Sequence, residues 1–85
     1  MNIQLRFFAS IRETLGTSQE SVTLPEQVRT VGDVRHFLIT RGGAWAECLA
    51  ESRTLRMAFN QVMAEPDTLL SEGCEVAFFP PVTGG

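Results

Sequence analysis

Apolar and polar residues alternate near both ends of the chain. The first stretch, Ile3-Gln4-Leu5-Arg6-Phe7, has the period of two that is typical of a strand with one face in a hydrophobic core. A second run, from residue 75 to residue 79, places Val76 and Phe78 at alternate positions and stops at Pro80-Pro81. Because proline lacks the N–H group that a strand ladder needs, these prolines predict the end of a last strand.

The main helical signal lies between these two strands. Val31, Val34 and Leu38 recur at helical spacing. Thr30, with Asp33 three positions later, has the pattern of a helix N-cap, and Gly42-Gly43 is a stop signal. We therefore predict one main helix that begins at Thr30 and ends at the two glycines.

Shorter elements fill the rest of the chain. Ser10 and Glu13 have capping-box spacing, which predicts a single helical turn before a strand at residues 20–24. A short helix is predicted at residues 45–49, and a strand from residue 55 is turned by Asn60-Gln61. This order predicts an α+β, β-grasp domain over residues 1–81, with a mixed sheet wrapped around one main helix, followed by an extended tail over residues 82–85.

Composition and charge exclude several classes of function. The 85 residues carry a net charge of -3, and all seven basic residues are scattered arginines, so we expect no nucleic-acid partner. Polar residues interrupt the apolar stretches of the first 16 positions, so we expect no membrane span and a cytoplasmic location. Two cysteines and one histidine, far apart in sequence, are too few for a metal site, and we expect Cys48 and Cys74 to be free thiols.

The last two residues are Gly84 and Gly85, and two residues separate them from Pro80-Pro81. The prolines stop the strand and predict that the last four residues project as an extended tail that enters another protein. A glycine terminus threads a narrow channel and leaves its carboxylate open to attack. A carboxylate needs activation, for example as an adenylate, and the chain has neither a phosphate-binding glycine loop nor a lysine. Activation must come from a partner enzyme.

Several segments resemble the small, sulfur-carrying subunit of molybdopterin synthase, a ubiquitin-like protein. They are LRFFA at residues 5–9, RE at 12–13, TV at 30–31, FNQ at 59–61 and GCEVAFFPPVTGG at 73–85. The resemblance implies that an E1-like adenylating enzyme uses ATP to activate Gly85 and that a persulfide donor converts it to a thiocarboxylate. It also implies that the sulfur goes to cyclic pyranopterin monophosphate, inside a large catalytic subunit with which the carrier forms a heterotetramer. The isolated chain would then be no enzyme and would bind no cofactor.

Two residues depart from this resemblance. Cys74 stands where the family usually has aspartate, and Phe59 stands where a smaller aliphatic residue is usual. A thiol beside a turn, with no histidine close in sequence, is expected to be inert. His36 is expected on the polar side of the main helix, as a solvated residue.

Strand parity predicts where a partner docks. If Ile3, Leu5 and Phe7 face the helix, Phe8 points to the other side of the sheet, and so does Phe79. The first and last strands of a β-grasp fold are neighbours, so the two rings should form an exposed pair near Met63. The residues predicted to contact partners are Phe8, Met63, Phe79, Pro80, Pro81, Val82 and Thr83.

Three other functions fit the sequence. One is a sulfur carrier for thiazole synthesis or RNA thiolation, against which the PPVT segment at residues 80–83 argues. A second is a protein modifier that forms isopeptide bonds with lysines, and a third is an interaction module whose tail has no role. Whether the chain gains a terminal sulfur, becomes attached to other proteins, or does neither distinguishes them.

Overall fold

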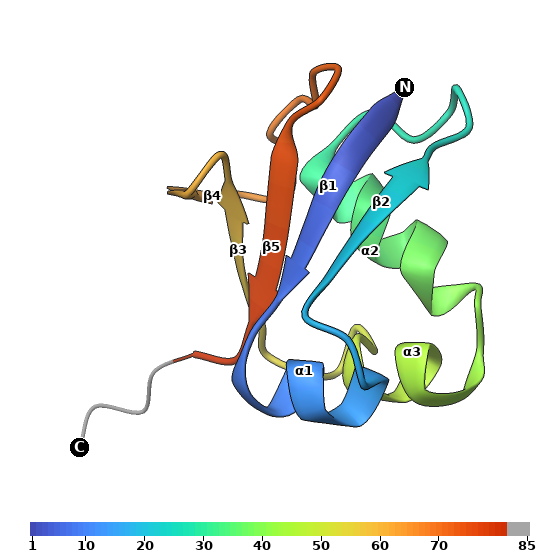
Figure 1. The fold of residues 1–85 in the computed structure, drawn as a ribbon, viewed down its shortest axis with the longest axis vertical. Coiled ribbons are helices and arrows are strands. Elements are labelled where there is room, and N and C mark those ends of the chain that lie inside the picture. Colours follow the sequence, from blue (N-terminus) through green and yellow to red (C-terminus); the bar gives the residue numbers. More distant parts are fainter. Residues whose placement is uncertain (82–85) are drawn as a thin grey trace.

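The computed structural model describes residues 1–81. Its elements follow in the order β1 (Asn2–Phe7), α1 (Ala9–Leu15), β2 (Gln19–Thr23), α2 (Val31–Ile39), α3 (Gly43–Cys48), β3 (Arg56–Phe59), β4 (Val62–Ala64) and β5 (Glu75–Phe79). The strands form a five-stranded sheet in the order β2-β1-β5-β3-β4. Helix α2 lies behind this sheet in the view of Figure 1, and α1 and α3 lie beyond the lower ends of the central strands. This confirms the predicted α+β, β-grasp architecture.

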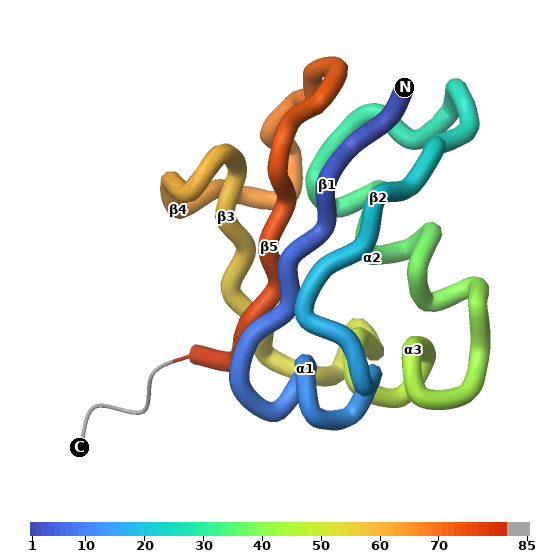
Figure 2. The backbone as a smooth tube through the Cα atoms, in the orientation of Figure 1, coloured from blue at the N-terminus to red at the C-terminus, as the bar shows by residue number. Residues whose placement is uncertain are grey.

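The centre of the sheet is the parallel pair of β1 and β5, which run side by side (Figure 2). Phe7 at the end of β1 is opposite Phe78 near the end of β5. The remaining ladders, β1 with β2, β3 with β5 and β3 with β4, are antiparallel. Because parallel strands end at the same edge of a sheet, the chain leaves through Pro80 and Pro81 beside the end of β1.

The hydrophobic core lies between the inner face of the sheet and α2. The alternation predicted for β1 and β5 is confirmed, because their inward residues are all fully buried: Ile3, Leu5, Phe7, Val76 and Phe78. Val31, Val34 and Leu38 of α2 are fully buried against them. One face of the sheet is therefore covered by α2, and the side chains of the other face lie at the surface of the domain.

The start of α2 is a complete capping box, as predicted. The Thr30 hydroxyl accepts a hydrogen bond from the Asp33 N–H at 3.1 Å, and the Asp33 carboxylate accepts one from the Thr30 N–H at 3.2 Å. A further hydrogen bond from the Arg29 N–H is the main cause of the lowered pKa of Asp33, and those from Thr30 add to it. The helix itself ends at Ile39, before the predicted stop, and Gly42 with φ 75° is the N-cap of α3.

Two local predictions are wrong. No side chain caps α1, which begins at Ala9 and runs for seven residues, so Ser10 lies inside the helix and is not its N-cap. The reason is that the backbone turns out of β1 at Ala9, with φ 53°, before Ser10 is reached. Strand β4 was missed because it has three residues and two of them, Val62 and Met63, are exposed apolar side chains.

Both cysteines are free thiols, as predicted, and both are buried. His36 is exposed, as predicted, and its ring lies against Glu51. Among residues 1–81 there is no group of three or more side chains that could hold a metal ion. Nor does any helix in this described part have the length and apolar character needed to cross a membrane.

Candidate functional site

The predicted aromatic pair is present on the outer face of the sheet, at the edge where the chain leaves. Phe8 follows the last residue of β1 and Phe79 ends β5, and their ring centroids are 6.3 Å apart at an interplanar angle of 84°. Phe8 retains 42% of its exposure, whereas Phe7 and Phe78, one position earlier in each strand, have none. The assignment of faces made from strand parity is therefore confirmed.

An edge-to-face pair of phenylalanines, one exposed and one half-buried, suits a docking surface. Such a pair contributes about 0.5–1.5 kcal/mol beyond its buried area, so each ring holds the other in place before a partner arrives. Preorganised aromatic rings lose little conformational entropy on binding, which is why they recur among the residues that dominate binding energies.

A positive charge borders the pair. The guanidinium carbon of Arg6 lies 5.8 Å from the centroid of the Phe8 ring, within the range of a cation–π contact. Its Nη1 atom is also 3.8 Å from an oxygen of Glu75. Arg6 is thus held along the outer face, between the aromatic ring and a carboxylate, and presents a cation beside the pair.

Met63 lies on the same face but does not join the pair. In the register of the sheet it is opposite Ala58, which is opposite Ala77 of β5, whereas the β3 neighbour of Phe79 is Arg56. Met63 is 59% exposed, while the two alanines between it and β1 are buried. The outer face therefore has two separate apolar side-chain groups, the aromatic pair and Met63, and the small side chains of the two alanines lie between them.

The chain leaves the sheet at the pair itself. Pro80 and Pro81 follow Phe79 directly and are half-buried, and they end the ladder of β5. The remaining predicted site residues, Val82, Thr83, Gly84 and Gly85, lie outside the described residues, so their roles stay predictions. The aromatic pair and the start of the tail nevertheless belong to one edge of the molecule.

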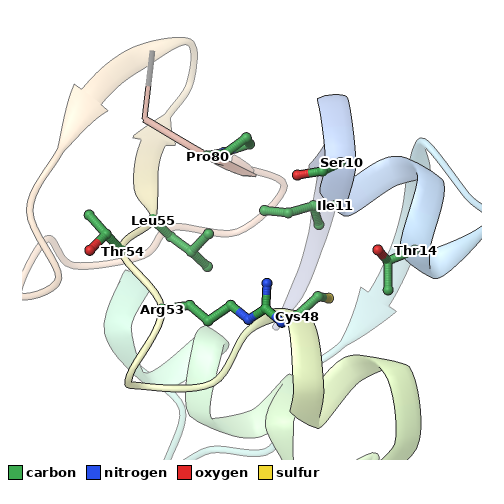
Figure 3. A pocket seen from close by; sticks show the side chains of 8 residues that line it. All are labelled: Ser10, Ile11, Thr14, Cys48, Arg53, Thr54, Leu55 and Pro80. Carbon is green, nitrogen blue, oxygen red and sulfur yellow. The ribbon is translucent and has the colours of Figure 1, made fainter. Parts of the chain in front are cut away.

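A pocket of about 280 Å³ lies beside the start of the tail. Its lining residues are Ser10, Ile11, Thr14, Cys48, Arg53, Thr54, Leu55 and Pro80 (Figure 3). Sequence analysis missed it because its walls come from α1, from the end of α3, from the segment before β3 and from the exit of β5. Burial raises the pKa of the Cys48 thiol, so that thiol is protonated at neutral pH and gives the pocket no nucleophile.

Comparison with known proteins gives consistent results. The model of the ThiS family matches residues 5–85. The chain is 40% identical over 83 residues to a protein of Escherichia coli named molybdopterin synthase sulfur carrier subunit, with 98% of this chain and 99% of the relative covered. It is 36% identical, with the same coverage, to the protein of that name from Haemophilus influenzae. The fold also matches a chain in the complex of subunits 1 and 2 of the molybdopterin-converting factor from Helicobacter pylori, with a TM-score of 0.69, 22% identity and full coverage of both chains.

Proposed function

The chain belongs to the ThiS family, and from that membership we propose that it is the sulfur carrier subunit of a molybdopterin synthase. The observation that carries the proposal is the extent of the match. The two bacterial relatives of that name are similar over 98% of the chain, and the family model extends to Gly85, the last residue. The similarity thus includes the terminus that would hold the sulfur as well as the fold.

The working atom in this proposal is the carboxyl carbon of Gly85. Adenylation by an E1-like enzyme forms a bond from a carboxylate oxygen to the α-phosphorus of ATP, and pyrophosphate leaves. The terminal sulfur of a protein persulfide then attacks the carboxyl carbon, and AMP leaves with one of the two carboxylate oxygens. Reduction of the resulting acyl disulfide by a thiol releases the thiocarboxylate. In this proposal the chain supplies the acceptor carbon, and the pocket beside the exit has no carboxylate, histidine or lysine in its lining that could activate its hydroxyl groups or the protonated Cys48 thiol.

The second half of the reaction requires a partner. The Helicobacter pylori chain of similar fold is known in a complex with a second subunit, and a large subunit of this kind would hold the pterin substrate and the catalytic side chains. We propose that the large subunit binds the outer face of the sheet at Phe8 and Phe79 and receives Pro80, Pro81 and the tail residues Val82 and Thr83. Gly84 would allow the terminus to pass through a narrow channel.

The geometry supports this arrangement without assigning catalysis to the domain. The aromatic pair is 6.3 Å from centroid to centroid and ends the two central strands. A protein that binds the edge of the sheet at Phe8 and Phe79 also contacts the chain where it leaves β5, and so fixes the direction of the tail. Anchoring near the reacting terminus supplies the positioning that makes a transfer between bound groups fast.

The proposal is tested by the mass of the terminus. Incubation with the cognate adenylating enzyme, ATP, a persulfide donor and a thiol reductant should replace one oxygen of Gly85 by sulfur, and fragment spectra should place that sulfur on the last residue. Addition of the large subunit and the pterin substrate should then return the carboxylate. Sulfur on Cys48 or Cys74 would contradict the mechanism, and an isopeptide bond to lysines of other proteins would show that the chain is a modifier.

A further inference from the structure

The pocket beside Pro80 has a chemical character of its own. Three of its lining residues bear hydroxyl groups (Ser10, Thr14 and Thr54), one bears a guanidinium group (Arg53), and none bears a carboxylate. Ile11 and Leu55 point toward each other across the pocket, and Arg53 extends toward Cys48 (Figure 3). In a chain with net charge -3, the lining of this pocket therefore carries a positive charge against apolar walls.

The charge of Arg53 is not neutralised inside the domain. Within residues 1–81, the Arg53 guanidinium makes no hydrogen bond or ion pair, whereas Arg41 binds both oxygens of Glu20 and Arg6 lies near Glu75. Burial is the main cause of the raised pKa of the Cys48 thiol, and the charge of Arg53 opposes that rise. The lining of the pocket thus contains one cation and no acidic side chain.

The backbone that carries Arg53 is held in place from α2. The Arg35 side chain donates hydrogen bonds to the carbonyl groups of Leu49, Ala50 and Arg53, at 2.7, 2.5 and 2.8 Å. These three charge-assisted bonds hold the segment between α3 and β3 against the main helix. The backbone of Arg53 is consequently fixed beside the pocket by the main helix.

The location of the pocket indicates what covers it. Five residues follow Pro80, and at about 3.3–3.6 Å per residue the terminus is never more than about 18 Å from this wall of the pocket. A protein that encloses the carboxyl group of Gly85 must therefore lie within about 18 Å of this wall. An acidic side chain on its surface would reach the exposed Arg53 guanidinium, and the bound partner would shield this ion pair from water and so strengthen it.

We propose that this pocket binds a carboxylate side chain, aspartate or glutamate, of the large subunit that receives the tail. The proposal rests on the function proposed above and adds to it a second, charged anchor beside the aromatic pair. A single guanidinium balances the single charge of a carboxylate, and the rim hydroxyls are donors for its remaining lone pairs. Arg53 would then fix the orientation of the domain as the tail enters, while Phe8 and Phe79 supply the apolar contact.

The test is calorimetric titration of the cognate large subunit with the carrier variants Arg53→Gln and Arg53→Glu. Arg29→Gln is the matched control, since Arg29 is also exposed and lies before α2, away from the exit edge. We expect Arg53→Gln to raise Kd by about tenfold or more, as loss of a charge-assisted hydrogen bond does. Arg53→Glu should raise it further, and the control should stay within about twofold of the wild type. One Asp→Arg or Glu→Arg variant of the large subunit should restore the binding of Arg53→Glu.

Several results would overturn the inference. If both Arg53 variants bind like the control while Phe79→Ala binds poorly, the pocket takes no carboxylate, and the proposed function stands. If the wild-type carrier does not bind the large subunit at all, both proposals fail. Inorganic phosphate, titrated into the carrier alone, should not bind below about 10 mM. Tight phosphate binding that Arg53→Gln abolishes would identify a site for small anions instead.

Discussion

The side chains of Phe78 and Phe79 are adjacent in sequence and point to opposite faces of β5, so their removal should have opposite consequences. Phe78 is fully buried and its ring lies 6.5 Å from that of Phe7, nearly parallel to it. Phe79 is partly exposed and meets Phe8 edge to face. Alanine at residue 78 leaves a cavity in the core, whereas alanine at residue 79 removes part of a surface.

The expected sizes follow from burial. Phe78→Ala should lower the free energy of unfolding by about 3–5 kcal/mol, the range for a buried phenylalanine, which is a large part of the roughly 4–13 kcal/mol available to a domain of this length. Phe79→Ala loses an aromatic pair and partial burial, and should cost about 1–2 kcal/mol. In binding to the large subunit, Phe79→Ala should lose about 2 kcal/mol or more, near a 30-fold rise in Kd.

Denaturant unfolding and calorimetric titration measure the two quantities separately. Phe37→Ala is a suitable control, because Phe37 is likewise half-buried but belongs to α2, on the covered side of the sheet. It should lose stability and keep its affinity. If Phe79→Ala unfolds as readily as Phe78→Ala and yet binds normally once folded, the docking surface lies elsewhere.

Four further predictions concern the tail, the two residues of the helix cap and a thiol. Deletion of Gly85, or one residue appended after it, should abolish sulfur transfer but leave the thermal midpoint within about 1 °C, because the buried core lies N-terminal to the tail; transfer by an extended, unprocessed chain would contradict the mechanism. Thr30→Ala should cost about 1 kcal/mol in denaturant unfolding, as loss of an N-cap does. The pKa of Asp33 is lowered from its ordinary 3.8 in the folded chain, so its contribution to stability is complete only well above 3.8 and is lost as pH falls through the folded pKa. The stability advantage of the wild type over Asp33→Asn should be constant above about pH 5 and shrink as pH falls below that value. In a Cys74→Ser background, Cys48 should react slowly with iodoacetamide until the chain unfolds, since burial raises its pKa; fast labelling of the folded protein would refute its burial.

The local sequence was sufficient to predict the structure of a short segment wherever one kind of interaction within that segment dominates. The alternation in β1 and β5 assigns each side chain to a face, because successive residues of a strand point in opposite directions. Thr30 and Asp33 predicted the start of α2 correctly, because a capping box is complete within four residues. The terminal glycines and the PPVT segment before them led to the prediction that the tail carries the sulfur, and this prediction needed no knowledge of the fold.

Tertiary structure decided what depends on residues that are distant in sequence. Ser10 failed as a cap because the end of β1 fixes where the backbone turns, and the spacing of Ser10 and Glu13 contains no information about that turn. Met63 was predicted to lie near the aromatic pair, but the register of β3 and β4 places it beside Ala58. The pocket around Arg53 joins residues from Ser10 to Pro80. Arg53 lies beside this pocket because Arg35 holds the segment that carries it. The lining residues are brought together only by folding, so no local sequence pattern predicts them.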